Sequence, residues 1–132
     1  MTSSSGELSR DVKRLCREAG HPTSDGEIDV ALEGDRTQRV RVVEVDDDSL
    51  QIETVVARSR RLGEVEHVAL RAWRRNRGTR LVGFRVDHRG HLLGHAWVPR
   101  AGLTADDLAI YVHAVALEAD RFEFLLTGLD VE

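Results

Sequence analysis

The sequence predicts an α+β domain whose five-stranded antiparallel sheet carries its helices mainly on one face. Three features lead to this class: short segments alternate apolar and polar residues, longer segments repeat apolar residues at helical spacing, and turn-forming residues separate them closely. The resulting order is α-β-β-β-α-β-β-α. A chain of 132 residues can build its own core, so we expect a single domain over 1–132, of which 1–6 form a flexible tail.

The first half of the chain is expected to form one helix and three strands. Apolar residues recur at helical spacing from Leu8 to Ala19, and Gly20 with Pro22 predicts the end of this helix. Strands are predicted where apolar and β-branched residues alternate or run together, at 27–33, 39–45 and 50–57. Turn residues at 34–35 and 46–49 join these strands by connections short enough for hairpins.

The second half predicts a helix, a strand hairpin and a long final helix. The helix is expected at 64–76, and the strands at 80–87 and 91–98 around Gly90, which tolerates the positive φ of a tight turn. Thr104 and Asp107 form a capping pattern that opens the last helix, which runs to Leu126.

The last helix has two apolar faces, which is the strongest indication of function in the chain. The broad face is wide enough to cover a core and consists of Leu108, Tyr111, Val112, Val115, Ala119, Phe122 and Leu126. On nearly the opposite side, Ile110, Leu117 and Phe124 form a second line with Ala114 between them. A solvated helix does not need this line, so we expect it in a dimer or partner interface. The alternative is burial within the same chain, under the first helix or the strand loops.

The predicted sheet also has an apolar second face. If Val82, Phe84 and Val86 face the helices, the opposite face carries Leu81, Leu93 and Trp97, together with Val43, Val45 and Val55. That face is more apolar than a solvated sheet face usually is. Leu81, Leu93 and Trp97 therefore join the predicted partner or dimer interface. A register shift of one residue would exchange the two faces.

Positive charge is concentrated in the middle of the chain. The formal net charge is −4, yet residues 58–89 hold ten arginines against three acidic residues, a local balance of +7. The segment 58–80 is therefore an alternative site, a nucleic-acid contact made by Arg71, Trp73, Arg74 and Arg75 through phosphate neutralisation and base stacking. A pI near 5.9 argues against this alternative, because nucleic-acid-binding domains are usually basic.

The sequence predicts a cytoplasmic protein. No stretch approaches the roughly 20 apolar residues of a membrane-spanning helix, so no membrane partner is expected. Residues 1–6 are polar and lack the basic and then apolar pattern of a signal peptide.

No enzyme, cofactor or metal chemistry is predicted. The chain lacks a glycine-rich phosphate loop, a nucleophile elbow and a His-Glu metal motif. Cys16 is the only cysteine, which excludes an internal disulfide, and we expect it to pack within its helix. His91 and His95 share a strand face but are some 13 Å apart, too far to bind one metal ion directly. The acidic run 46–48 lacks the spacing of a calcium loop.

Short motifs in the C-terminal half are shared with a known bacterial family. They are the segments 72–76 (AWRRN), 81–87 (LVGFRVD), 90–92 (GHL), 102–104 (GLT) and 119–122 (ADRF). Together they resemble the YbjN-type domains, which are also described as sensory transduction regulators. The resemblance implies a fold similar to that of type III secretion chaperones, whose element order agrees with the order predicted above. It also implies a homodimer without catalytic residues that binds an unidentified protein in a chaperone-like or regulatory role.

Overall fold

The computed structural model describes residues 8–20, 26–78 and 81–127, and these ranges contain the predicted elements in the predicted order. The helices are α1 (Arg10–Glu18), α2 (Val68–Asn76) and α3 (Ala105–Thr127). The strands are β1 (Glu27–Ala31), β2 (Thr37–Glu44), β3 (Ser49–Ala57), β4 (Gly83–Val86) and β5 (Leu92–Pro99), with a short 3₁₀ turn, η1 (Glu33–Asp35), after β1. The predicted tail at 1–6 and Pro22 lie outside the described residues.

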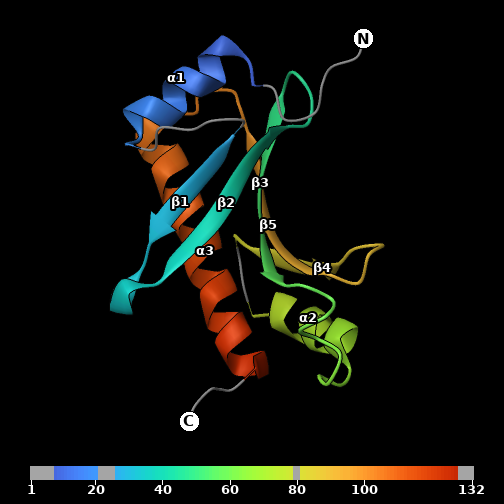
Figure 1. Ribbon diagram of the computed structural model, residues 1–132. Coiled ribbons are helices and arrows are strands. Elements are labelled where there is room, and N and C mark those ends of the chain that lie inside the picture. Colours follow the sequence, from blue (N-terminus) through green and yellow to red (C-terminus); the bar gives the residue numbers. More distant parts are fainter. Residues whose placement is uncertain (1–7, 21–25, 79–80, 128–132) are drawn as a thin grey trace.

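All five strands form one antiparallel sheet in the order β1-β2-β3-β5-β4. The long helix α3 crosses one face of this sheet, and α1 packs against α3 near its first turns (Figure 1). The shorter α2 lies beside β4 at the end of the sheet (Figure 1). The predicted α+β class is therefore confirmed. Among the described residues, no helix combines the length and apolar character needed to cross a membrane.

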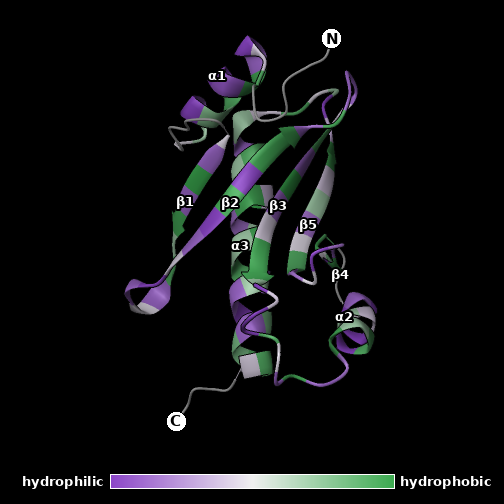
Figure 2. Cartoon of the chain, turned by 45° about the vertical axis from the view of Figure 1, so that its right-hand side comes forward, coloured by the Kyte–Doolittle hydropathy of each residue, from purple (hydrophilic) through white to green (hydrophobic). Residues whose placement is uncertain are grey.

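The core lies between the sheet and α3. Alternate strand residues are buried on the helix side, which gives β1 and β2 their alternating bands of hydropathy (Figure 2). Burying an aliphatic or phenyl side chain of this kind stabilises the fold by about 1.5–3 kcal/mol. The predicted orientation of Val82 and Phe84 toward the helices is confirmed, since each is 3% exposed. Val86 shares this face, because it pairs in register with the buried Leu92, but it is 37% exposed at the end of the short edge strand β4.

The helix ends follow the predicted capping chemistry. At the start of α3, the Asp107 amide donates to Thr104 Oγ1 at 3.1 Å, and the Thr104 amide donates to Asp107 Oδ2 at 3.4 Å. This reciprocal pair satisfies two amides that have no acceptor within the helix. In the first helix, Gly20 follows the C-cap with φ of +88°, a conformation that glycine adopts without steric cost.

The helix predicted at 64–76 begins later than expected. Residues 64–67 form turns, and α2 starts at Val68 because His67 takes φ of +58°, which a right-handed helix cannot include. At the other end, the Asn76 side chain pairs with the backbone of Phe84. Its amide donates to the Phe84 carbonyl at 2.9 Å and its oxygen accepts from the Phe84 amide at 2.6 Å. This contact covers part of the outer edge of β4.

Candidate functional site

The outer face of α3 carries exposed apolar side chains, with Arg121 among them. Ile110 and Phe124 are 61% and 62% exposed, and Leu117 between them is half-buried. Leu125, which the sequence analysis did not single out, is 57% exposed near the end of the same helix. Burial of Ile110 and Phe124 within the chain, the alternative considered from the sequence, is therefore wrong for the described residues. Apolar side chains exposed along several helical turns form a surface that a partner can cover.

The face of the sheet opposite α3 combines apolar and charged side chains. Trp97 is 60% exposed, and Leu93 is half-buried opposite Val55 of the neighbouring strand. Both point away from the helices, as predicted, because their neighbours in β5 alternate with them and are buried. A polar row crosses four strands beside them through the register pairs Glu27↔Arg41, Arg41↔Glu53 and Glu53↔His95. This open sheet face is thus amphipathic.

Leu81 lies apart from Leu93 and Trp97. It precedes β4, is 50% exposed, and lines a cavity of about 580 Å³ that includes Ala114 of α3 and Arg74 of α2. The six predicted interface residues therefore fall into two groups. Leu81 belongs with the outer side of α3, and only Leu93 and Trp97 belong to the open sheet face.

The arginines of α2 do not present one basic face. Arg75 forms an ion pair with Glu118 of α3 at 3.2 Å. Arg71 donates to a backbone carbonyl of α3 at 3.3 Å. Trp73 and Arg74 are exposed, and Trp73 retains 57% of its accessible surface. Two of the four predicted nucleic-acid contacts are therefore engaged within the chain.

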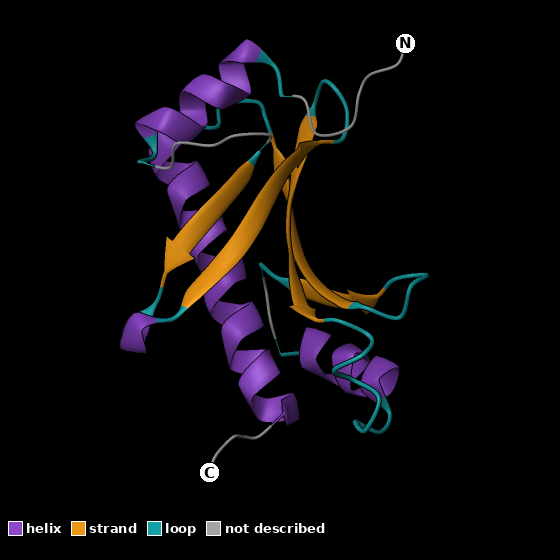
Figure 3. Cartoon of the chain, viewed as in Figure 1, coloured by secondary structure: helices purple, strands orange, loops and turns teal. Residues whose placement is uncertain are grey.

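A cleft opens where β2 and β3 separate, and the sequence analysis did not predict it. The ladder between these strands covers only four register pairs, and beyond them the strands diverge (Figure 3). Side chains bridge the narrow end of the gap. The Thr54 hydroxyl donates to the Arg39 carbonyl, and the Gln38 amide donates to Thr54 Oγ1 at 2.7 Å and to the Val55 carbonyl at 3.1 Å. The cavity measures about 750 Å³, within the range typical of ligand pockets.

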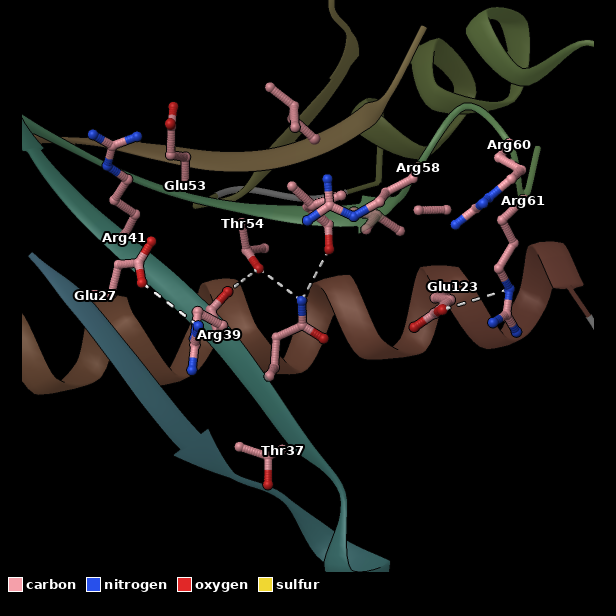
Figure 4. Close-up of a pocket in the computed structure, with 15 residues that line it drawn as sticks. Glu27, Thr37, Arg39, Arg41, Glu53, Thr54, Arg58, Arg60, Arg61 and Glu123 are labelled. Atoms are coloured by element: carbon pink, nitrogen blue, oxygen red, sulfur yellow. Dashed lines mark hydrogen bonds and ion pairs between the residues drawn. The ribbon is translucent and has the colours of Figure 1, made fainter. Parts of the chain in front are cut away.

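Arginines from β2 and from the turn that follows β3 surround this cleft (Figure 4). Arg39 is held by Asp29 through two hydrogen bonds of 2.9 and 3.3 Å. The Nε of Arg41 is buried, and within the described residues it has no hydrogen-bond partner. The full set of charged lining residues is Arg39, Arg41, Arg58, Arg60 and Arg61 against Glu27, Glu53 and Glu123. Positive charge is therefore in excess at the cleft, although the whole chain is acidic.

Two of the histidines, His91 and His95, and the buried Cys16 belong to the packing and hydrogen bonding of the fold. The Nδ1 of His91 accepts a hydrogen bond from the Ser59 amide at 2.8 Å. Burial, together with the nearby charge of Arg85, lowers the pKa of His95. Burial also raises the pKa of the Cys16 thiol, which has no exposed surface in α1. In the described ranges, no group of three or more His, Cys, Asp and Glu side chains is placed to hold a metal ion.

Two solved complexes share this architecture. Neither a protein-family model nor a curated protein matches the chain. A chain of the ExsC-ExsE complex superposes with a TM-score of 0.65 at 16% sequence identity, over 94% of this chain and 99% of that chain. A chain of the HopA1-SchA chaperone-effector complex gives 0.53 at 12% identity, over 89% and 90%. These likenesses confirm the predicted chaperone-like fold, while the resemblance to YbjN-type domains stays a prediction.

Proposed function

We propose that this protein is a non-catalytic, protein-binding domain that acts as a homodimer in a chaperone-like or regulatory role. The observation that carries the proposal is the outer face of α3, where Ile110 and Phe124 are mostly exposed although the opposite face of the helix already fills the core. Covering such apolar surface favours association. The ExsC-ExsE and HopA1-SchA structures are complexes of one protein with another, which supports a protein partner for this fold.

The proposed dimer interface is the outer face of α3. A two-fold axis would bring the same residues of both subunits together, so Ile110, Leu117 and Phe124 would each meet the matching stripe. Phe124 is the aromatic side chain of the stripe and is the natural anchor. The open sheet face, with Leu93 and Trp97, then stays available for the partner protein.

Light scattering tests the homodimer. The wild-type protein is expected at twice the monomer mass of 14.8 kDa, and the dimer should persist at high salt because salt screens charges and not apolar contacts. Phe124→Asp buries a carboxylate in the proposed interface and should yield a monomer. His88→Asp adds the same charge at an exposed position of the β4–β5 hairpin and should remain a dimer. A monomeric wild-type protein, or a stable dimer of Phe124→Asp, contradicts the proposed interface.

Nucleic-acid binding is the alternative, and exposed Trp73 and Arg74 on α2 are the observation in its favour. The internal contacts of Arg71 and Arg75 weaken it. A fluorescent single-stranded oligonucleotide tests this function. Binding that weakens steeply with added salt and in Trp73→Ala supports a nucleic-acid-binding function. The absence of binding at low salt contradicts this function.

A further inference from the structure

We infer that the cleft between β2 and β3 binds an extended acidic segment of a partner protein, which adds as a strand to the edge of β3. The inference rests on the proposed protein-binding function and adds a site that is separate from the outer face of α3. Figure 4 shows the cleft between the two diverging strands, with α3 behind it.

The backbones of both strands point hydrogen-bond acceptors into the gap. The carbonyls of Val55 and Arg39 face it, because they accept from the side chains of Gln38 and Thr54 across it. In a complete sheet these groups would bond to the backbone of the neighbouring strand. A carbonyl oxygen accepts two hydrogen bonds, so capacity remains for the amides of an added strand. Beyond Val55, β3 continues to Ala57 without pairing to β2.

The arginines around the cleft select acidic residues in the added strand. Arg58 and Arg60 directly follow β3, are exposed, and have no side-chain partner among the described residues. Arg61 is tied only loosely to Glu123, at 4.0 Å. Arg41 adds a further guanidinium whose Nε has no acceptor among the described residues. Carboxylates on alternate residues of a strand project to one side, where they can pair with these guanidiniums.

The rest of the lining combines the polar side chains of Thr37, Gln38 and Thr54 with an apolar part. Val56 and Ala57 are buried and Leu93 is half-buried, and all three contribute to its wall. The ligand that fits is therefore a segment in which acidic and apolar residues alternate. A nucleic acid would satisfy the arginines, but its phosphates have no hydrogen-bond donors for the Val55 and Arg39 carbonyls. The backbone acceptors thus favour a peptide.

The test uses a short fluorescent peptide of alternating glutamate and valine, with binding followed by fluorescence anisotropy at low salt. The full chain should bind this probe and should not bind a lysine-valine peptide of equal length. A second probe carries N-methyl groups on alternate amides, which preserves side chains and charge but removes the donors for β3. This probe should lose binding. Equal binding of the methylated and unmethylated probes overturns strand addition.

Charge reversal tests the location of the site. Arg58→Glu combined with Arg60→Glu should weaken binding of the probe by at least about tenfold. Arg10→Glu combined with Arg17→Glu makes the same charge change at exposed positions of α1, and should leave the affinity unchanged. Circular dichroism verifies that both pairs fold. Equal weakening by both pairs indicates unspecific attraction and overturns the site, as does complete displacement of the probe by an oligonucleotide of equal charge.

Light scattering on the same samples separates this inference from the proposed homodimer. Ile110→Asp places a carboxylate on the outer face of α3 at a residue that does not line the cleft, and this variant should bind the glutamate-valine probe as the wild type does. A monomeric protein that binds the probe contradicts the homodimer and supports the cleft. A dimer that fails to bind the probe supports the homodimer and overturns the cleft.

Discussion

Phe122 and Phe124 lie close together on α3 and have opposite environments. Phe122 is 3% exposed and packs edge to face on Phe84, with ring centroids 4.8 Å apart. Arg75 lies over the same ring, with its guanidinium carbon 5.4 Å from the centroid. Truncating such a side chain to alanine costs about 3–5 kcal/mol of folding stability. Phe124 is 62% exposed, so its apolar surface is available to association rather than to the fold.

His95 is expected to make the stability of the protein depend on pH. Burial and the charge of Arg85 lower its pKa, while Glu53 opposes them. The folded state then takes up the proton at a lower pH than the unfolded state, so stability falls as pH drops through the unfolded pKa of about 6.5. His95→Gln should flatten the free energy of unfolding between about pH 7 and pH 5, measured with urea. His88→Gln, at an exposed position, is the control, and an unchanged slope in His95→Gln contradicts the assignment.

At the scale of helices and strands, the sequence predicted the type and order of the elements but missed some of their ends. Alternation and helical spacing are local patterns, so the burial of residues such as Val40 and Ile52 can be predicted from the residues next to them. The start of α2 cannot be predicted in this way. Helical spacing continues through Val65, yet His67 takes φ of +58° and the helix begins at Val68. Histidine adopts the left-handed region more often than most residues, but this tendency is too weak to end a predicted helix.

The cleft between β2 and β3 was missed because it depends on how two strands separate. Each strand alternates regularly, and the register of β3 against β5 shifts between Val55 and Ala57 without a local signal. The available hint was the polar pair Gln38 and Thr54, which lies on the same face of each strand as the core residues. Thr54 is 4% exposed, and a buried hydroxyl must find a hydrogen bond. Polar residues at core positions of adjacent strands therefore indicate a gap that side chains must bridge.

The cap of α3 provides a prediction at the scale of one helix. Thr104→Ala removes the acceptor of the Asp107 amide and should lower the free energy of unfolding by about 1 kcal/mol in denaturant titrations. Thr127→Ala is the matched control, because its hydroxyl only donates to the Glu123 carbonyl one turn earlier, at 2.9 Å. That change should stay within about 0.5 kcal/mol. Equal effects of the two substitutions would contradict a role for the cap.

At the scale of the whole molecule, the two apolar surfaces point in opposite directions. The outer face of α3 lies on the far side of that helix from the sheet, and the open sheet face lies on the far side of the sheet from α3 (Figure 1). A second subunit that covers Ile110 and Phe124 would thus leave Trp97 in contact with water. The arrangement allows one surface to serve the homodimer and the other to serve a partner protein at the same time.

Trp97 can report which of these surfaces the dimer covers. Trp73→Phe leaves Trp97, which is 60% exposed, as the only tryptophan, and acrylamide quenching then measures its contact with solvent. If the interface is on α3, quenching should stay constant as the protein concentration is raised through the monomer-dimer transition. Adding Phe124→Asp should not change the value. Quenching that falls as the dimer forms would instead move the interface to Leu93 and Trp97, because only burial of the open sheet face removes this ring from water.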